Sequence, residues 1–438
     1  MRRWFLRALG LLAVVGVVVI VSELAAGRDP IAPLRRALAA SRPPIVVGLI
    51  HSRTGALAIS EKSLLDAEML AIDEINAQGG VAGRLLKAEL ADGRSEALTF
   101  AAEATRLIER EKAEVLVGGW TSECRKALLG VVEAKDSLLI FPSNYEGIEA
   151  SSHIIYASGS ANQVIFPGVR WCLDQLKVKS FYVVGNEEIW SRVVAEMAKD
   201  AVKTAGATLV GETYLPMGGG DADATVAAIR QAKPDIVLDM LVGDDNVPFF
   251  AALRRAGSTP EKLPVLAFNV SEDEMRRFPP GDLTGHYAAW SYFQSIDRPE
   301  SADFVRRFKA RYGQDRVVSD AMVAAYNGLM IWSHTAEEAG TSDPRIVRNR
   351  FDRQSFAAPE GIVTIDPDSR ASWRPFYLGQ ARADGQFEVV FALRKPTLPV
   401  AYPATRPKDH WLALLEEHRA RWGGRWSSAG VARPTTDR

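Results

Sequence analysis

The sequence predicts an α/β protein of two lobes, each built on a parallel sheet that is covered by helices. From residue 45 onward, short β-branched runs alternate with longer segments whose apolar residues recur at the helical period. This alternation occurs in two successive series, and repeated strand–helix units form parallel sheets. The length of 438 residues is sufficient for two domains with large cores.

The first series begins with a buried strand and continues with helices whose ends are marked in the sequence. Strands are expected at 45–50, 86–91, 114–117, 138–141 and 154–157, and helices at 65–80, 96–111 and 122–133. The first helix should end at Gly79 and Gly80, because glycine readily adopts the left-handed conformation that closes a helix.

The second series has the same character and a similar length. Its helices are expected at 164–175, 190–205, 222–231 and 247–255, and its strands at 180–184, 208–214, 236–241 and 265–268. Two more helices, at 303–312 and 321–339, come without strands and should complete one lobe. Strands at 362–365, 376–380 and 387–393 follow all these helices, so we expect them to return to the other lobe.

The predicted domain organisation is therefore discontinuous. The first lobe is expected to contain residues 45–157 and 292–357, and the second residues 158–291 and 358–395. A chain that leaves and re-enters each lobe crosses between them three times, which makes a hinge. We expect the crossings near 156–160, 288–292 and 357–361.

Composition and motifs exclude several classes of protein. Lys and Arg total 53 and Asp and Glu total 54, so the net charge of −1 gives no basic field for nucleic-acid binding. Cys124 and Cys172 cannot form a disulfide framework or a cysteine-rich metal site. The six histidines have no metal-ligand spacing, and no dinucleotide, Walker or nucleophile-elbow motif occurs. The sequence predicts no nucleic-acid partner, no metal, no cofactor and no catalytic residue.

The N-terminus has the pattern of an export signal. Arg2, Arg3 and Arg7 precede an uncharged apolar run over 8–22. The residues before Ala26 do not fit the small-residue pattern of a cleavage site, so an uncleaved membrane anchor is favoured over a cleaved signal within 1–26. A linker over 27–44 follows. We therefore expect an extracytoplasmic, periplasmic protein tethered to the cytoplasmic membrane.

Polar residues gather where the predicted strands end. Open parallel sheets bind ligands outside the carboxyl ends of their strands, so these clusters are candidate sites. They lie at 118–122, 141–147, 186–190 and 243–246. The run 218–223 superficially resembles a cation loop, but Asp221 precedes a helical period and is better interpreted as a helix N-cap.

These clusters belong to a longer set of ordered motifs. The motifs are GLIHSRTGALAISE (48–61), EINAQGG (74–80), GGWTS (118–122), YEG (145–147), GDDNVPF (243–249), WSYF (290–293), APEG (358–361) and ADGQFEVV (383–390). Together they resemble the urea- and short-chain-amide-binding branch of the type I periplasmic binding proteins over about residues 45–395. The resemblance implies two Rossmann-like lobes, joined by a three-crossing hinge, that close on a small solute without catalysis.

The resemblance also implies which residues contact the solute. The first-lobe clamp corresponds to Ser122 and the backbone of 120–122, and Phe141, Ser143 and Tyr145 form the adjoining wall. The second-lobe face corresponds to Trp190 and Asp244. The full expected site is Trp120, Thr121, Ser122, Phe141, Ser143, Tyr145, Glu188, Trp190 and Asp244.

Glu188 departs from the family pattern, which has an aromatic residue at this position. It has two interpretations. Its carboxylate pairs with Arg192 four residues later on the same helix, or it faces the cleft near Asp244 and favours an amidinium or guanidinium solute.

Three functions follow from this resemblance. The expected one is binding of urea, a short-chain amide or a related amidine- or guanidine-like compound by lobe closure, and delivery to an ABC permease in the membrane. A sensor that signals through the same closure is the alternative, because the fold alone does not fix the partner. An amide- or urea-processing enzyme is a remote third, since no nucleophile–base motif occurs.

The chain continues beyond the motifs as a C-terminal extension over 396–438. Trp411, Leu415, His418 and Trp422 fall on one face of a predicted helix, and a Gly/Ser/Arg-rich tail follows. We expect this helix to dock on one of the lobes; a surface for a permease, another partner or the membrane is the alternative.

Overall fold

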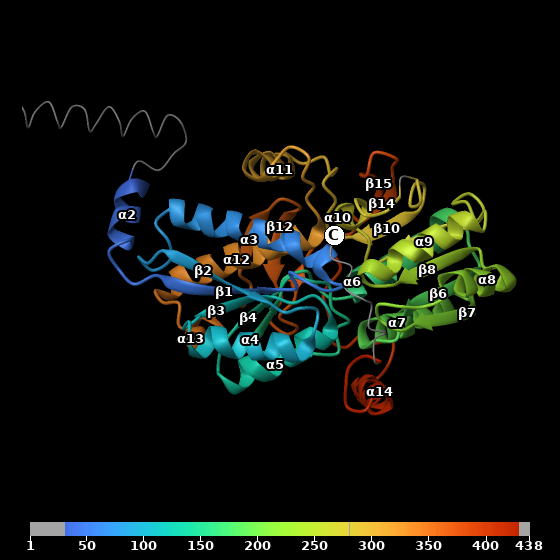
Figure 1. The fold of residues 1–438 in the computed structure, drawn as a ribbon, viewed down its shortest axis with the longest axis horizontal. Coiled ribbons are helices and arrows are strands. Elements are labelled where there is room, and N and C mark those ends of the chain that lie inside the picture. Colours follow the sequence, from blue (N-terminus) through green and yellow to red (C-terminus); the bar gives the residue numbers. More distant parts are fainter. Residues whose placement is uncertain (1–30, 280, 429–438) are drawn as a thin grey trace, which may run out of the picture.

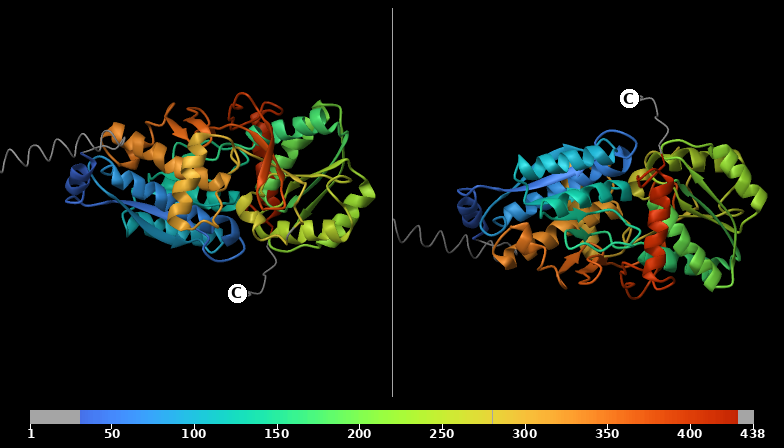
Figure 2. Two further views of the ribbon diagram at one scale, coloured as in Figure 1. Left: turned by 90° about the horizontal axis from the view of Figure 1, so that it is seen from above. Right: turned by 90° about the horizontal axis from the view of Figure 1, so that it is seen from below.

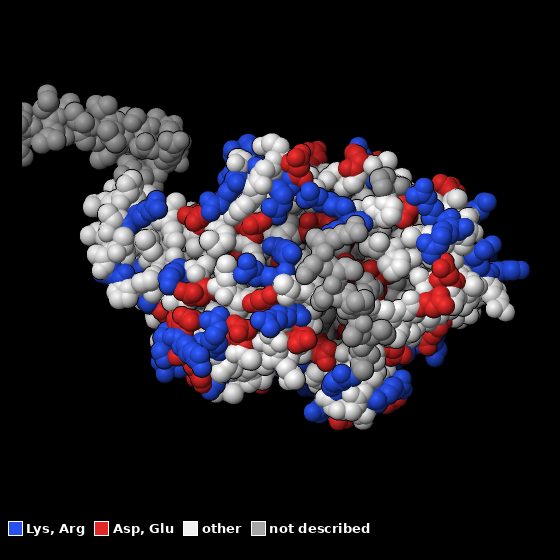
Figure 3. All heavy atoms as spheres, viewed as in Figure 1, with Lys and Arg blue, Asp and Glu red and all other residues white. Residues whose placement is uncertain are grey.

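A computed structural model describes residues 31–279 and 281–428 of the chain. Within these ranges the protein has two α/β lobes that lie side by side (Figure 1), which confirms the predicted fold class. On the face drawn in Figure 3, acidic and basic side chains are intermixed, as the net charge of −1 leads one to expect.

The first lobe is built on a five-stranded, fully parallel sheet in the order β2-β1-β3-β4-β5. Its strands are β1 (Ile45–His51), β2 (Leu86–Asp92), β3 (Val115–Gly118), β4 (Leu139–Phe141) and β5 (Ile154–Tyr156). The central strands β3 and β4 are buried along their whole length, because helices cover both faces of the sheet.

Helices cover this sheet in two pairs. One pair is α4 (Ala97–Glu109) and α5 (Ser122–Ala134), and the other is α3 (Ala58–Ala77) and α12 (Asp320–Ala339) (Figure 1). Helix α11 (Pro299–Tyr312) contacts α3 from outside. Segments that follow the second lobe in sequence thus complete the first lobe.

The second lobe is built on a seven-stranded sheet in the order β15-β14-β10-β9-β8-β6-β7. Its strands are β6 (Ser180–Asn186), β7 (Thr208–Leu215), β8 (Ile236–Met240), β9 (Val265–Ala267), β10 (Tyr287–Trp290), β14 (Tyr377–Ala381) and β15 (Phe387–Ala392). Its helices are α6 (Asn162–Trp171) with a π-turn at Cys172–Leu176, α7 (Ile189–Thr204), α8 (Ala222–Ala232), α9 (Asn246–Arg255) and the short α10 (Glu272–Met275). Strands β14 and β15 are the antiparallel part of the sheet.

The strand expected at 362–365 does not join the second lobe. It is β12 (Gly361–Ile365), which pairs with β11 (Ser355–Ala358) and β13 (Ser372–Trp373) in a separate antiparallel sheet. Strand β11 contacts α12, and Ala371 bridges to Tyr156, so this small sheet lies on the first lobe. The expected crossing at 357–361 is therefore wrong, and the chain crosses at 374–376, between β13 and β14.

The two ends of the described chain add helices outside the sheets. Helix α2 (Ala32–Ala39) lies in the segment that is predicted to be a linker. A four-residue helix, α13 (Pro344–Val347), lies between α12 and β11 in the sequence. Helix α14 (Lys408–Arg421) packs on α7 with Trp411 fully buried, which confirms docking on a lobe. No helix among residues 31–279 and 281–428 is long and apolar enough to cross a membrane, and the predicted anchor lies outside these residues.

A buried ionic cluster joins the three crossings. Arg374, in the third crossing, donates from Nη1 to both oxygens of Asp320 at 2.6 and 2.7 Å and from Nε to Glu360 at 2.8 Å. The same guanidinium reaches Ser158 in the first crossing at 3.3 Å, and the backbone of Ser291 in the second hydrogen-bonds Asp320. Burial raises the pKa of Asp320 to about 6 even beside Arg374. The hinge is therefore fixed by one interconnected set of charges.

Replacing Arg374 with methionine should destabilise the protein strongly. The substitution leaves Asp320 and Glu360 buried without their cation, and breaking such a pair costs about 3–5 kcal/mol of unfolding free energy. Arg382→Met is the matched control, because Arg382 pairs with Asp384 at the surface and such pairs contribute less than about 1 kcal/mol. Urea unfolding of both variants checks this, and equal losses would contradict the assigned role of Arg374.

Candidate functional site

The carboxyl ends of both sheets face each other across the boundary between the lobes. The loop after β3 passes close to the end of β1, where a Cβ on Gly118 would lie 1.8 Å from the carbonyl oxygen of Ile50. Gly118 and Gly119 both have positive φ, so only glycine fits here without strain. This close turn delivers Trp120 to the boundary between the lobes.

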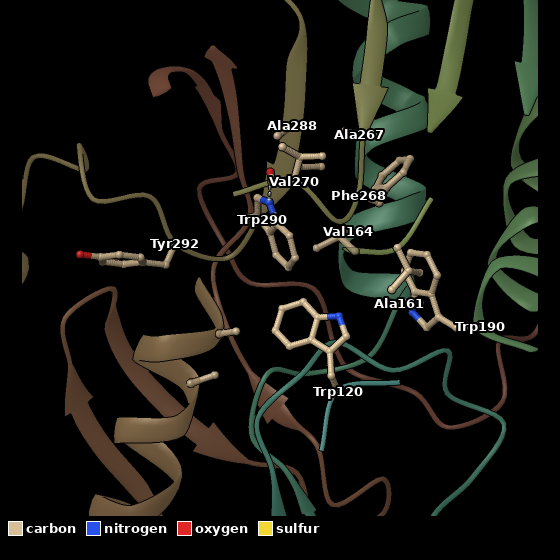
Figure 4. Close-up of a cluster of buried hydrophobic side chains, with 14 of the residues drawn as sticks. Trp120, Ala161, Val164, Trp190, Ala267, Phe268, Val270, Ala288, Trp290 and Tyr292 are labelled. Carbon is tan, nitrogen blue, oxygen red and sulfur yellow. Dashed lines mark hydrogen bonds between the residues drawn. The ribbon is translucent and has the colours of Figure 1, made fainter. Parts of the chain in front are cut away.

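An aromatic cluster lines the centre of this boundary. Figure 4 shows Trp120 of the first lobe beside Trp290, with Trp190 and Phe268 of the second lobe around the same centre. The three tryptophans are only 3–6% exposed. Residues Ala161 and Val164 at the start of α6 complete the apolar wall. The lobes thus meet through flat, apolar surfaces.

The indole N–H groups in this cluster have different roles. The Nε1–H of Trp290 donates to the carbonyl oxygen of Val270 at 2.8 Å, so it holds a loop of the second lobe. The Nε1–H of Trp190 is buried and has no hydrogen-bond partner among the described residues. In Figure 4 it points toward the N–H edge of Trp120. Two donors thus face the same space from opposite lobes.

Two side-chain amides near the strand ends are also unpaired. Asn144 follows β4 and Asn269 follows β9, and the Nδ2 group of each is buried without a partner among the residues that the structure describes. Buried donors are costly when unpaired. Donors of this kind at both strand ends favour a ligand that carries acceptor oxygens.

Thr121 and Ser122 hold the loop in place rather than presenting their hydroxyls to the cleft. The side chain of Thr121 caps α5 by accepting from the backbone N–H of Cys124 at 3.2 Å. The hydroxyl of Ser122 donates to Glu146 and accepts from Arg125 at 3.0 Å. The Ser122 hydroxyl is therefore used within the first lobe, and the expected clamp by the backbone of 120–122 stays a prediction.

A charged network lies behind this loop. Arg125 is fully buried and donates to Glu146 at 2.6 Å and to Glu149 at 3.0 Å. Burial alone would raise the pKa of Glu149, but the charges of Arg125 and Lys126 outweigh it and hold this pKa at about 2. Because every charge here has an opposite partner, the network supports the site without adding net charge to it.

The expected wall residues pack against this network. The guanidinium of Arg125 lies 5.3 Å from the ring centre of Phe141 and 5.2 Å from that of Tyr145. Tyr145 stacks on Tyr156 with ring centres 4.0 Å apart. Ser143, which lies between Phe141 and Tyr145 in the sequence, is also buried. Phe141 and Tyr145 therefore support the first-lobe loops from behind.

A second buried group fixes the start of α3. His51, at the end of β1, is hydrogen-bonded through Nε2 to Glu68 at 2.7 Å, and Glu61 accepts from the backbone N–H of Ser52 at 2.9 Å. Burial alone would lower the pKa of His51, but these two carboxylates outweigh it and raise the pKa to about 10. His51 is therefore a buried histidine held between two carboxylates, those of Glu61 and Glu68.

Glu188 takes neither of the two expected positions. Its carboxylate caps α7 by accepting from the backbone N–H groups of Trp190 at 2.8 Å and Ser191 at 2.6 Å. Arg192 pairs with Glu187 instead. The carboxylate is thus directed at its own helix, and the predicted pair of acidic groups for a guanidinium solute is not formed.

Asp244 lies in the turn that follows β8. It belongs to a 3₁₀ turn at Gly243–Asp245, which contacts α3 of the first lobe. Its neighbour Asp245 accepts from Asn186 at 2.8 Å and from the backbone of Gly218 at 2.9 Å.

Asp221 caps α8 by accepting from the backbone N–H of Ala224 at 2.8 Å, so the run 218–223 is a helix start.

Comparison with known proteins agrees with this architecture. Residues 45–408 match the family model described as periplasmic binding protein domain. The chain belongs to the type I periplasmic binding protein family. Among solved structures, a solute-binding protein of an ABC transporter from R. palustris, in complex with 4-hydroxybenzoate, matches with a TM-score of 0.74. It is 19% identical, and the match covers 81% of this chain and 98% of that one.

Curated proteins with similar sequences match only parts of this chain. Leu/Ile/Val-binding protein BraC3 of Rhizobium johnstonii is 24% identical over 44% of this chain and 53% of its own length. A protein named limonene hydroxylase, from Geobacillus stearothermophilus, is 38% identical over 26% of this chain and 20% of its own length. The matched regions thus cover between a fifth and about half of the length of these two relatives.

The sequence reasoning missed several residues of the aromatic cluster. Trp290 stands in one of the quoted motifs, WSYF, but its strand β10 reads Tyr-Ala-Ala-Trp and has no β-branched residue. Phe268 directly follows β9, at the strand end where ligands are expected. This position at a strand end is the sequence feature that could have identified Phe268 as a site residue.

The pH dependence of folding should change when Glu188 is replaced with glutamine. Burial raises the pKa of Glu188 from 4.5 to about 7, so the folded state holds a proton that the unfolded state releases. This contribution to stability is complete below pH 4.5, declines as the pH rises and is lost above about pH 7. Urea unfolding at a series of pH values should show wild type losing stability relative to Glu188→Gln across this window. A constant difference would contradict the shifted pKa.

Proposed function

We propose that this protein binds a small planar solute with acceptor oxygens between its lobes and delivers it to an ABC permease. The observation that carries the proposal is the inter-lobe aromatic cluster with the unpaired, buried N–H of Trp190. Flat indole surfaces favour a flat ligand, and an indole N–H is only a donor, so it favours a carbonyl or carboxylate oxygen. Closure gains these contacts only when both lobes meet.

Urea and short-chain amides fit this description and are the first candidates. Each is planar and carries a carbonyl oxygen for the indole N–H groups. Glu188 is directed at its own helix, so an amidinium or guanidinium is disfavoured. Two similar proteins supply the competing candidates: one was solved in complex with 4-hydroxybenzoate, and the other is named a Leu/Ile/Val-binding protein. An aromatic acid would also fit, because its ring would lie against the flat indole surfaces and its carboxylate carries two acceptor oxygens.

A sensor is the second candidate function. Helix α14 lies along the second lobe beyond the region of the family match, as Figure 2 shows in red, and gives a surface that the lobes themselves do not supply. The same closure would then be read by a partner protein instead of a permease. A pull-down with the permease of the same membrane separates these two functions.

The solute can be identified directly. Mass spectrometry of small molecules released from the purified protein, followed by calorimetry, should find a planar compound with acceptor oxygens. Urea, acetamide, 4-hydroxybenzoate, isoleucine and guanidinium form the panel for calorimetry. The proposal is overturned if no compound is released and none in the panel binds, or if guanidinium alone binds.

Trp190→Phe should weaken binding of the identified solute about tenfold, as expected for one hydrogen bond worth about 1.5 kcal/mol. Phenylalanine keeps the flat wall but removes the donor. Trp290→Phe is the matched control, because the Nε1–H of Trp290 already donates to Val270. It should lower thermal stability while changing solute affinity less. Wild-type affinity in Trp190→Phe would contradict the assigned donor.

The N-terminal segment should hold the protein on the membrane. A chain that starts at Pro44 should be soluble, whereas the full-length protein should stay with membranes after a high-salt wash, because an apolar segment resists salt. Fractionation and immunoblotting test this. Recovery of the full-length product as a soluble protein without residues 1–26 would show a cleaved signal instead.

A further inference from the structure

The C-terminal strap, residues 422–428, contacts both lobes at the candidate site. It follows α14 and lies next to the loop after β6, where Ser427 forms an antiparallel bridge with Glu188. The backbone N–H of Ile189 donates to Trp426 at 2.9 Å, and that of Ser428 donates to Glu187 at 2.8 Å. The strap is thus paired with the segment directly before Trp190.

The extension that carries the strap is fixed to the second lobe. Arg406 donates to Asp200 at 2.7 and 2.8 Å and to Glu196 at 2.7 Å, and both carboxylates are on α7. Trp411 is fully buried, and its Nε1–H donates to the carbonyl oxygen of Pro403 at 2.9 Å. With α14 packed on α7 and the strap paired with the loop that precedes α7, α14 and the strap must move with the second lobe.

The contacts of the strap with the first lobe are of another kind. The hydroxyl of Ser427 donates to Glu123, in the first turn of α5. The ammonium of Lys126, one turn later on α5, lies 5.1 Å from the ring centre of Trp426. These are two polar side-chain contacts near the surface, and neither involves the backbone. Separation of the lobes breaks them without unfolding either lobe.

We propose that residues 422–428 are a latch, fixed to the second lobe, that holds the first lobe through Glu123 and Lys126 and stabilises the closed state. The family match ends at residue 408, so this latch lies outside the region shared with the family model. Its effect on solute release rests on the function proposed above. Its effect on lobe separation does not, because the contacts join the lobes directly.

The test measures the distance between the lobes in the full-length protein without added solute. Spin labels at Leu98→Cys on α4 and Ala228→Cys on α8 report on the first and second lobes, because both positions are exposed. The native Cys124 and Cys172 are buried and should stay unlabelled. Pulsed electron paramagnetic resonance then gives the ratio of open to closed molecules.

The variant Trp426→Ala/Ser427→Ala removes both side-chain contacts but keeps the backbone pairing. It should raise the ratio of open to closed molecules about tenfold, as for loss of a hydrogen bond to a charged group. Arg425→Ala is the matched control, because Arg425 is an exposed strap residue outside these contacts, and it should leave the ratio unchanged. Equal distance distributions in the double variant and Arg425→Ala overturn the latch.

A second pair of variants separates a latch from general support of the second lobe. Glu123→Ala changes only the first lobe, yet it should also raise the open fraction. Adding Ser427→Ala to Glu123→Ala should then give little further opening, because the two side chains share one contact. Fully additive effects would overturn the proposal. If no solute is found for wild type, these distances still test the latch, so the two proposals can fail separately.

Discussion

The ionic cluster around Arg374 is the constraint on which the arrangement of the lobes depends. Three chain segments pass between the lobes, and this one guanidinium contacts Asp320, Glu360 and Ser158. A buried cation tolerates only positions in which its carboxylates and remaining donors are satisfied. The cluster therefore limits how the three crossings can shift relative to each other. The position of Trp120 opposite Trp190 follows from that limit.

The same rule of satisfied charges explains why the candidate site is mostly neutral. Arg125 is neutralised by Glu146 and Glu149, His51 lies between Glu61 and Glu68, and Glu188 caps its own helix. These charged groups thus serve the loops rather than the space between the lobes. The indole rings of Trp120, Trp190 and Trp290 face that space. Selectivity in such a site depends on shape and on hydrogen-bond acceptors more than on ligand charge.

Local patterns predicted the elements but not all of their partners. The strands of the first lobe are recognisable because runs such as Ile45–His51 combine β-branched residues with burial on both faces. The period of a strand does not state which sheet it joins, and for this reason β12 was assigned to the wrong lobe. Strand β10 was missed because Ala288 and Ala289 have little strand propensity; its neighbours β9 and β14 hold it in the sheet.

Spacing identified the candidate loops, but atomic geometry decided the roles within them. The four-residue spacing of Glu188 and Arg192 is suitable for an ion pair, yet Glu187 competes for the same arginine. The free backbone N–H groups at the start of α7 then attract the Glu188 carboxylate, because a helix start favours negative charge. The sequence shows both possible partners of Arg192, which are Glu187 and Glu188. The choice between them depends on distances of one or two ångströms that only the folded chain fixes.

The ligand and the strap act on lobe closure in different ways. A ligand shifts the equilibrium only by the difference between its affinities for the closed and open states. The contacts of the strap with Glu123 and Lys126 are present in the closed state whether or not the space between the lobes is filled. They therefore change the starting equilibrium, and the ligand contributes the rest. A stronger strap would raise apparent affinity, but it would also close empty molecules and so reduce the difference that a membrane partner can detect. Side-chain contacts near the surface, weaker than the hinge cluster, are suited to that compromise.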